Sequence, residues 1–403
     1  MKKVIQINSV CNGSTGKIMY YIQKTANDFG YETLSIHGRR NSYKDLKCKK
    51  IGNIFSFLFH VLITFVFNKH NHGSYFQTKR LVDFLKKYNP DIIHLHNIHG
   101  YYLNNKILFN YLNKDFKGKI IWTLHDCWTF TGHCAHFDYE KCSKWKKECK
   151  KCSLKHVYPY SWFFDTSNKE FNNKKELFSN LNNLTIVTPS IWLKNKVKDS
   201  FFKKHECIVI NNGIDLNIFK PNIDNNVFVK YNIPKNKKII LGVASVWTSK
   251  KGYNTFINLS SKLSSNVIII MVGLTKKQVK YLPKNIIGIE RTENVKELVS
   301  LYSLADIFVN PTLEDTYPTT NLEAIACGTP VICYNTGGCI EQINNKVGKI
   351  VMNNNIKELL NQVNLFLKDD FKNTNFNNID ILKKIDSKNK YKEYMNLYEK
   401  GDM

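Results

Sequence analysis

The sequence lacks an apolar run long enough to cross a lipid bilayer. Its longest apolar stretch, Ile54–Phe67, has 14 residues with His60 inside it, whereas a membrane-spanning helix needs about 20. This stretch predicts a buried or interfacial helix. We also expect no secretory leader, because Val4–Ile7 passes directly into a turn that contains glycine. We therefore expect a cytoplasmic protein, peripheral at the inner face of the membrane where this helix meets lipid.

Acidic residues are scarce relative to basic ones. The chain has 33 Asp and Glu against 59 Lys and Arg, a formal net charge of +26. Such an excess favours partners that carry phosphate, namely nucleotides, nucleic acid or an anionic membrane surface. Most of the lysines are scattered among asparagines, which is the usual pattern of a solvated surface. The net charge alone does not indicate which of these partners the protein binds.

Short-period repeats are absent, and the chain instead alternates β-branched runs with longer amphipathic stretches. This alternation predicts an α/β protein with parallel sheets and crossover helices. The length of 403 residues allows two domains that each have a core. The predicted strands are Val4–Ile7, Ile92–Leu95, Ile120–Leu124, Thr185–Val187, Ile208–Ile210, Ile239–Val243, Val267–Val272, Ile286–Ile289, Ile307–Val309 and Val331–Cys333.

The predicted strands are more than a single sheet usually contains, so we expect two Rossmann-like domains. A break near Phe219–Pro221 places them at residues 1–218 and 219–385, with a C-terminal helix over 386–403 that packs back on the first domain. A cysteine-rich insertion occupies residues 127–165. Because ligands of open parallel sheets bind beyond the carboxyl ends of the strands, functional motifs should follow the strands directly.

The strongest motif, residues 310–330, directly follows the run Ile307–Val309. It opens a helix near Thr319 and Thr320, whose first-turn amides can hold a diphosphate through hydrogen bonds and the helix dipole. Glu323 can accept from ribose hydroxyls, and the earlier acid, Glu314 or Asp315, lies nearer a sugar. The alternative for Glu323 is a carboxylate that only favours the helix dipole.

Two lysines follow the run Ile239–Val243. Lys250 and Lys251 precede Gly252, and a cation at that loop stabilises charge that grows on a leaving diphosphate. Solvated surface lysines are the alternative.

This half of the chain resembles the family 4 glycosyltransferases of the GT-B fold, which carry a Glu-x7-Glu motif and, upstream, an Arg followed by Lys-Gly. Lys251 matches the family lysine, whereas Ala244 or Ser245 stands where the arginine is usual. Asp315 has the family spacing to Glu323, and Glu314 lies one position further away, so either can take the role of the first acid.

The resemblance implies two Rossmann-like domains that face each other across a cleft. It also implies a retaining hexosyltransferase that uses a UDP or GDP sugar and holds the donor phosphates with protein groups, so that catalysis requires no cofactor. The sequence has no Asp-x-Asp pair, which is consistent with this expectation. In the resemblance Arg291 lies near the nucleotide base.

The first half carries a glycine loop and two histidine motifs. Gly13 and Gly16 follow the first strand and open a helix, so their amides can approach phosphate or a sugar hydroxyl; a helix-opening turn without a ligand is the alternative. His94 and His96 lie at the end of another strand, where hydrogen-bonded structural histidines are the more frequent case. His125 matches the family histidine that contacts the donor sugar.

Asp126 follows His125 directly and is expected to fix its tautomer. Together these motifs resemble the colanic-acid-type polysaccharide glycosyltransferases. That subgroup implies a saccharide or lipid-linked saccharide acceptor in bacterial surface polysaccharide synthesis.

Four cysteines cluster in the insertion: Cys134, Cys142, Cys149 and Cys152. In a reducing compartment such a cluster more often binds zinc than forms disulfides, and four thiolates would make that zinc structural. Buried cysteines without a ligand and a transient redox pair are the alternatives.

Two other functions are compatible with the sequence. A basic nucleic-acid-binding protein would explain the net charge, but no recognised nucleic-acid motif accompanies it, and we expect no nucleic-acid partner. A sugar–phosphate-cleaving enzyme on the same fold is the second alternative, because a fold does not determine its reaction.

Overall fold

The computed structural model describes residues 1–39, 43–369, 371–372 and 379–400. The chain divides into a first unit, residues 1–211 with Tyr391 onward, and a second unit, residues 212–390. The sequence placed the boundary after residue 218, whereas the structure divides the chain after Asn211. The linking residues belong to the second unit because Ile214 and Phe219 are buried in its core.

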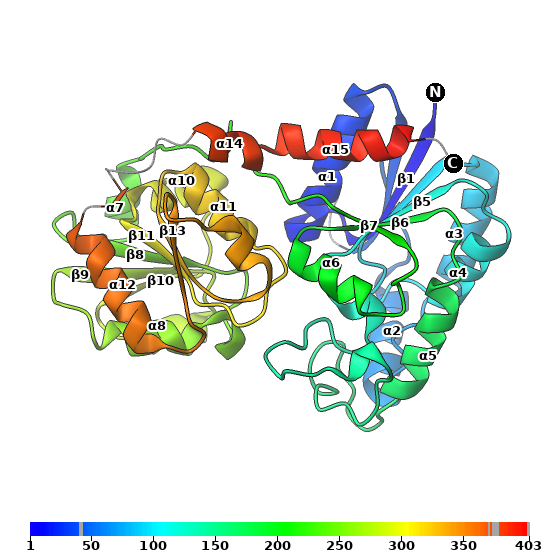
Figure 1. Cartoon of the computed structure of the whole chain (residues 1–403), viewed down its shortest axis with the longest axis horizontal. Coiled ribbons are helices and arrows are strands. Elements are labelled where there is room, and N and C mark those ends of the chain that lie inside the picture. The colour runs from blue at the N-terminus through cyan, green and yellow to red at the C-terminus, as the bar shows by residue number, and fades with distance from the viewer. Residues whose placement is uncertain (40–42, 370, 373–378, 401–403) are drawn as a thin grey trace. The chain divides into compact units, whose positions relative to one another are not determined.

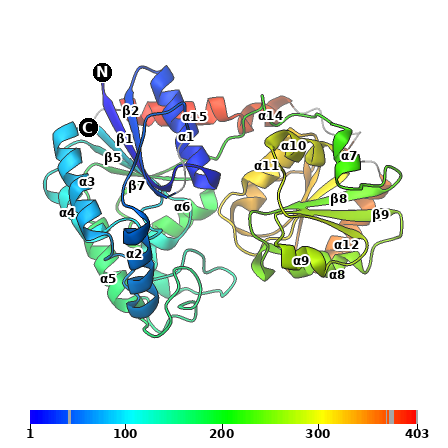
Figure 2. The same cartoon turned by 180° about the vertical axis from the view of Figure 1, so that it is seen from behind.

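The first unit is built on a parallel sheet of seven strands in the order β3-β2-β1-β4-β5-β6-β7. Figure 1 and the reverse view in Figure 2 show helices on both faces of this sheet. The strands are β1 Lys3–Val10, β2 Glu32–Arg39, β3 Cys48–Lys50, β4 Ile92–Leu95, β5 Lys119–Thr123, β6 Leu184–Thr188 and β7 Glu206–Val209. The helices are α1 Gly13–Asp28, α2 Ile54–Phe67, α3 Tyr75–Tyr88, α4 Asn105–Lys114, α5 Ser167–Phe178 and α6 Ile191–Lys198, with short 3-10 turns η1 Trp128–Phe130 and η2 Lys144–Lys146.

The second unit is built on a parallel sheet of six strands in the order β10-β9-β8-β11-β12-β13. The strands are β8 Lys238–Val243, β9 Val267–Val272, β10 Ile286–Ile289, β11 Ile307–Asn310, β12 Val331–Tyr334 and β13 Gly348–Val351. The helices are α7 Asn226–Lys230, α8 Tyr253–Ser260, α9 Lys276–Lys280, α10 Val295–Leu304, α11 Thr319–Ala326, α12 Ile356–Lys368 and α14 Ile379–Ile385, with turns η3 Ser249–Lys251 and η4 Gly337–Gln342. The last helix, α15 Ser387–Glu399, begins in this unit and continues in the first.

Both faces of each sheet are covered, which explains the nearly continuous apolar runs of the strands. In β1, Ile5 and Ile7 pack into one core cluster, and Val4 packs into another with Ile18 and Ile22 of α1. The strands of the second unit alternate in the same way between two clusters. The predicted α/β class with two parallel sheets is therefore confirmed.

Each predicted strand corresponds to a strand of the structure, but three strands were not predicted: β2, β3 and β13. β2 has polar Ser35 and His37 buried among its apolar residues, so its sequence does not read as an apolar run. The edge strands β3 and β13 are only 3 and 4 residues long.

The C-terminal helix α15 passes from one unit into the other at Tyr391. Its side chains Tyr391, Tyr394 and Tyr398 are buried with Ile18 of α1 in the first unit, and Tyr391 stacks on Tyr21 at 5.7 Å. The sequence placed a helix over 386–403 on this domain; residues 401–403 lie outside the described part of the chain.

The apolar stretch Ile54–Phe67 forms α2 with the bounds that the sequence predicted. Asn53 and Ser56 form a capping box at its start, and Asn68 ends it in the left-handed conformation. Among the described residues, no helix is both long and apolar enough to cross a membrane.

Candidate functional site

In both sheets the first strand of the unit lies inside the sheet. The next strands of the chain are added on one side of it, and the later strands on its other side. The order of the strands thus reverses between β1 and β4 in the first unit and between β8 and β11 in the second. Ligands of open parallel sheets bind at such switch points, beyond the carboxyl ends of the two strands. The motifs selected from the sequence follow β1, β8 and β11 directly, so they lie where this fold binds ligands.

Two lysines and two acids join the loops after β8 and β11. Lys250 Nζ lies 3.1 and 3.0 Å from the two carboxylate oxygens of Glu314. Lys251 Nζ lies 2.8 Å from Asp315 Oδ2 and 3.2 Å from the carbonyl oxygen of Glu314. A backbone hydrogen bond from Leu313 N to Lys250 O, 2.8 Å long, ties the same loops together. The structure thus brings all four predicted residues into one cluster.

Lys251 keeps its charge in this cluster. Burial favours the neutral amine, but the carboxylates of Asp315 and Glu314 outweigh burial and raise the pKa of Lys251. The site therefore presents a fixed cation at neutral pH. Glu314 is buried and Asp315 is half-buried, so a ligand reaches Asp315 more easily.

Gly337 supports Asp315 from the following loop. Its φ of +50° favours glycine, and a Cβ there would lie 1.8 Å from the carbonyl oxygen of Asp315. Gly337 is therefore required for close packing against the acidic loop.

The helix α11 begins next to this cluster, as the sequence predicted. Thr319 and Thr320 form its first turn and are half-buried. A chain of side-chain hydrogen bonds fixes the start of α11. Its links are Asn310 Nδ2 to Asn321 Oδ1 at 2.7 Å, Asn321 Nδ2 to Gln342 Oε1 at 2.9 Å and Gln342 Nε2 to Pro318 O at 2.9 Å. Sequence reasoning missed these three side chains, because side-chain amides carry no motif of their own.

Glu323 lies one turn into α11 and is held by a residue from another helix. The hydroxyl of Tyr302, on α10, donates to Glu323 Oε2 at 3.0 Å. Tyr302 is fully buried, and burial followed by the charge of Glu323 raises its pKa well above the usual value. The phenol therefore stays protonated and orients the carboxylate. Tyr302 was not predicted, because nothing in the sequence distinguishes it among the 21 tyrosines of the chain.

Arg291 lies apart from this cluster in the sheet. It follows β10, the edge strand, and is exposed. Two strands of the sheet order, β9 and β8, separate it from β11. Its predicted role near a base stays a prediction.

The glycine loop of the first unit has a backbone explanation. Gly13 has a φ of +81°, and a Cβ on Gly16 would lie 2.5 Å from the backbone of Cys11. Both positions therefore require glycine for the turn into α1. The contact with a ligand that the sequence predicts for this loop stays a prediction.

The histidines after β4 and β5 form a hydrogen-bonded chain. Gln6 Nε2 donates to Met19 O at 3.2 Å, which leaves Gln6 Oε1 to accept from His96 Nε2 at 3.0 Å. The other nitrogen of His96, Nδ1, is then the acceptor for His125 Nε2 at 3.1 Å. This order gives His125 a proton on Nε2 and makes Nδ1 its acceptor.

The ring of His94 stacks on that of His96, which in turn stacks on that of His125. The two ring nitrogens of His94 bond to Tyr398 and Thr123, both at 2.8 Å. Burial lowers the pKa of His125 to about 4 and that of His94 to about 3. These imidazoles are therefore neutral at physiological pH and act as hydrogen-bonding groups.

The structure gives Asp126 hydrogen-bond partners other than the predicted His125. Its two carboxylate oxygens bind His99 Nε2 at 3.0 Å and Trp128 N at 2.9 Å, whereas the ring of His125 is oriented by His96. Burial would raise the pKa of Asp126, but these contacts lower it to about 2. Adjacency in sequence suggested a different partner, but consecutive side chains leave the backbone in different directions.

The cysteine-rich insertion gathers four of its five thiols around one small cavity, lined by Cys134, Cys142, Cys149 and Cys152. Gly132 donates from its backbone nitrogen to Cys149 Sγ at 3.2 Å. In the part of the chain that the structure describes, no group of three or more His, Cys, Asp or Glu is arranged to hold a metal ion. The structural zinc therefore stays a prediction.

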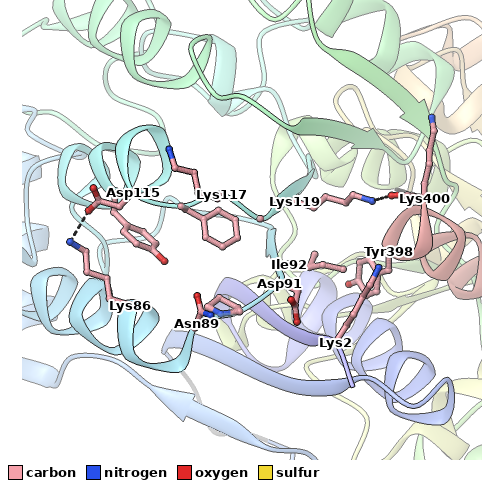
Figure 3. Close-up of a pocket in the computed structure, with 14 residues that line it drawn as sticks. Lys2, Lys86, Asn89, Asp91, Ile92, Asp115, Lys117, Lys119, Tyr398 and Lys400 are labelled. Carbon is pink, nitrogen blue, oxygen red and sulfur yellow. Dashed lines mark hydrogen bonds and ion pairs between the residues drawn. The ribbon is translucent and has the colours of Figure 1, made fainter. Parts of the chain in front are cut away.

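A separate open cavity of about 560 Å³ lies at the opposite end of the first sheet, by the first residues of β4 and β5 (Figure 3). There Lys86 pairs with Asp115 at 2.6 Å, and Lys119 donates to backbone carbonyls at the end of α15, including that of Leu397 at 2.9 Å. None of the predicted site residues lines this cavity.

Comparison with protein families gives a match in each half of the chain. Residues 52–218 match Glycosyltransferase Family 4, and residues 224–380 match the glycosyl transferases group 1.

Two curated relatives illustrate the level of similarity. A putative colanic acid biosynthesis glycosyl transferase of Escherichia coli is 25% identical over 308 residues, which cover 73% of this chain and 72% of that protein. An N,N'-diacetylbacillosaminyl-diphospho-undecaprenol alpha-1,3-N-acetylgalactosaminyltransferase of Campylobacter jejuni is 26% identical over 41% of this chain and 46% of its own length.

Solved structures share the fold over nearly the full chain. A sucrose-phosphate synthase from Thermosynechococcus elongatus superposes with a TM-score of 0.73 at 14% identity, covering 99% of this chain and 98% of that chain. An Anabaena protein in complex with UDP-glucose superposes with a TM-score of 0.67 at 13% identity, covering 99% of both chains.

Proposed function

We propose that this chain, which belongs to the glycosyltransferases of the GT-B fold, is a retaining enzyme that moves a hexosyl unit from a nucleotide diphosphate sugar to a saccharide acceptor in bacterial surface polysaccharide synthesis. The observation that carries the proposal is the cluster of Lys250, Lys251, Glu314 and Asp315 beside the start of α11. The cluster lies at the switch point of the second sheet.

The leaving diphosphate is the group that this cluster suits. Breaking the sugar–phosphate bond adds negative charge to the diphosphate, and Lys251 supplies a cation whose position is already fixed. The amides of Thr319 and Thr320 at the start of α11 add hydrogen-bond donors and the positive end of the helix dipole. Lys250 contributes further charge. In this proposal the transfer proceeds without an added metal ion.

The acids and His125 bind the remaining parts of the donor. Glu323, oriented by Tyr302, accepts from the ribose hydroxyls. Asp315, the more accessible acid, binds the sugar, and Glu314 holds Lys250 in place. His125 accepts from a sugar hydroxyl through Nδ1, because Nε2 carries the proton toward His96. Arg291 lies near the base, and the loop of Gly13 and Gly16 approaches donor or acceptor.

The acceptor in this proposal is a saccharide on a lipid carrier at the cytoplasmic face of the membrane. The names of the two relatives support it, since one concerns colanic acid biosynthesis and the other a diphospho-undecaprenol substrate. The complex of the structural neighbour with UDP-glucose favours a UDP sugar as donor.

A thermal-shift screen with UDP, GDP, UDP-glucose and GDP-mannose tests the donor site. A ligand that binds only the folded protein raises the unfolding temperature, so at least one nucleotide should do so, and Glu323→Ala should remove the shift. Single-stranded DNA is the control ligand. Stabilisation by DNA alone would favour the nucleic-acid alternative and contradict the proposal.

The reaction itself is tested by incubating the stabilising donor with lipid-linked and water-soluble saccharides. NMR of the product gives the anomeric configuration, which should equal that of the donor. Inversion would reject the retaining mechanism while leaving the transferase assignment intact. Release of free sugar or sugar phosphate, without transfer to any acceptor, would favour the cleaving enzyme.

A further inference from the structure

The helix α2 has its polar and apolar side chains in reversed positions relative to a helix of a water-soluble protein. Its buried residues are His60 and Thr64, and both are hydrogen bonded: His60 to Ser74 Oγ at 2.9 Å and to His70 O at 2.8 Å, Thr64 to His60 O at 2.8 Å. Six of its large apolar side chains are between 49% and 77% exposed. These six are Ile54, Phe55, Leu58, Phe59, Leu62 and Phe67.

A second apolar segment lies against the end of this helix. The loop 160–164 donates from Trp162 N to Phe65 O at 2.8 Å, and the ring of Trp162 lies 5.4 Å from that of Phe65. Phe164 stacks on Phe67 at 6.5 Å. Tyr160, Trp162, Phe163 and Phe164 are between 47% and 66% exposed. The six side chains of α2 and these four are called the apolar surface below.

Basic residues accompany the apolar surface without acidic ones. The segment 46–82, which contains α2, has no Asp or Glu and carries Lys47, Lys49, Lys50, Lys69, Lys79 and Arg80. The segment 151–164, which ends in the aromatic loop, also has no acid and carries Lys151 and Lys155. Of these cations, Lys69 contacts the apolar surface, with its Nζ 5.9 Å from the centre of the Phe67 ring. Asp45, Asp83 and Asp165 lie just outside the two segments. Cations beside an apolar patch complement a bilayer whose headgroups are anionic.

We propose that the apolar surface inserts into the interfacial layer of an anionic membrane, with α2 parallel to the bilayer plane. A helix of 14 residues is too short to span a bilayer, which needs about 20. Its hydrogen-bonded face is turned toward the protein, so lipid can receive the other face without burying an unsatisfied polar group. Trp162 and Tyr160 suit the headgroup boundary, where aromatic residues with a polar atom accumulate.

The inference deepens the proposed function, because it names the surface that would bring the enzyme to a lipid-linked acceptor. Its first test needs neither donor nor acceptor. The full chain is mixed with vesicles of phosphatidylglycerol and phosphatidylethanolamine in equal parts, or of phosphatidylcholine alone, and floated through a density gradient. The protein should float with the anionic vesicles, and less of it should float as the salt concentration rises from about 0.05 to about 0.5 M.

Variants separate this surface from other exposed apolar residues. Phe55→Ser, Phe59→Ser and Leu62→Ser in one chain should weaken binding to anionic vesicles by about a hundredfold or more, since each lost side chain is equivalent to about tenfold in affinity. Val229→Ser, Tyr281→Ser and Met352→Ser, which alter equally exposed residues of the second unit, should change it by less than about twofold. The far-ultraviolet circular dichroism of both chains should match the parent.

Trp162 reports insertion directly. Of the six tryptophans, four are buried and Trp192 is half-buried, whereas Trp162 is exposed. Vesicles with brominated acyl chains should quench the fluorescence of the parent and quench Trp162→Phe far less, although that variant still floats.

Three results would overturn the inference: no flotation with anionic vesicles, equal flotation of the serine variant, or a lipid-free dimer in sedimentation that the α2 serines dissociate. The last would assign the surface to a second copy of the chain. Transfer to a water-soluble acceptor should survive the α2 serines, so failure of this inference leaves the proposed function standing.

Discussion

The carboxyl ends of the two sheets hold their polar groups by different means. In the second unit, opposite charges fix one another: Lys251 and Asp315 lie 2.8 Å apart beside Lys250 and Glu314. In the first unit, neutral rings are joined in a chain from Gln6 through His96 to His125. Both arrangements orient side chains before a ligand arrives, but only the first presents a formal charge.

The difference agrees with the division of work in the proposed reaction. A diphosphate requires cations, and the paired carboxylates hold both lysines in place while it is absent. A sugar hydroxyl requires a donor or an acceptor of defined tautomer, which neutral histidines supply without attracting counter-ions. The following predictions test the comparison, from the largest expected effect to the smallest.

The cysteine loop of the first unit is expected to show the largest effect. We predict one structural zinc held by the four thiols that line its cavity. Elemental analysis of protein purified without chelator should give about one zinc per chain, and Cys149→Ser with Cys152→Ser should remove it and destabilise the first unit by several kcal/mol. Cys207→Ser, outside the loop, is the control. Fully folded parent protein without metal would reject the site.

Loss of the fixed cation of the second unit comes next. Lys251→Ala should lower the transfer rate about 10²–10³-fold, since its charge matters most when the diphosphate leaves. The dissociation constant of the donor should change much less. Lys262→Ala, an exposed lysine of the same unit, is the control in steady-state kinetics. A loss below about twofold for Lys251→Ala would place the phosphate site elsewhere.

Asp315→Asn and Glu314→Gln distinguish the two acids. The proposal expects Asp315→Asn to reduce transfer about 10–10²-fold with unchanged affinity for free UDP, because Asp315 is the acid that the sugar can reach. Glu314→Gln should have the smaller effect on rate, through Lys250. The opposite order in rate, with equal UDP affinity by calorimetry, would assign the sugar to Glu314.

The sequence was most informative where chemistry and position in the chain coincide. Runs such as Val267–Val272 predict strands because both faces of the sheet are covered, and Lys251 and Asp315 belong to loops that directly follow strands. β2 was missed since its buried Ser35 and His37 interrupt the apolar pattern. The short edge strands give little signal.

Partners that come from distant segments could not be predicted. Tyr302 reaches Glu323 from another helix, and His96 reaches His125 from another strand. No sequence rule links these pairs, because only the folded sheet brings them together. For the same reason the sequence assigned Asp126 to its neighbour His125, although the structure gives it to His99. The exposure of α2 likewise depends on what packs around it.

Acid should weaken the first unit through its neutral histidines. The pKa values of His94 and His125 are lowered to about 3 and about 4 by burial, against about 6.5 in the unfolded chain. Below pH 6.5 the unfolded state binds more protons, so stability falls with falling pH down to about pH 4, by about 1.4 kcal/mol per pH unit for each histidine.

Urea denaturation followed by tryptophan fluorescence measures this slope in the first unit, which holds five of the six tryptophans. His94→Gln should reduce the change of unfolding free energy with pH by the contribution of one histidine. His156→Gln, at an exposed position, should not. If the unfolding free energy of the parent stays constant between pH 7 and pH 5, a window set by the histidine pKa, the buried histidines are not neutral as described.

The smallest effect concerns Tyr302, and it tests whether hydrogen bonds also orient groups in the second unit. Tyr302→Phe removes the hydroxyl that donates to Glu323 at 3.0 Å, so the carboxylate is less well placed for the ribose hydroxyls. A hydrogen bond to a charged group contributes about 1.5 kcal/mol, or about tenfold in affinity. The dissociation constant for UDP should therefore rise by up to about tenfold in calorimetry. The catalytic rate at saturating donor should stay unchanged, because ribose is bound equally before and during transfer.

Tyr231 offers a matched control, since its hydroxyl donates to Glu297 at 2.6 Å outside the cluster, and Tyr231→Phe should leave UDP binding as it is. A lower rate with unchanged UDP affinity in Tyr302→Phe would instead mean that Glu323 acts on the reacting sugar, and charge alone would then orient the donor site.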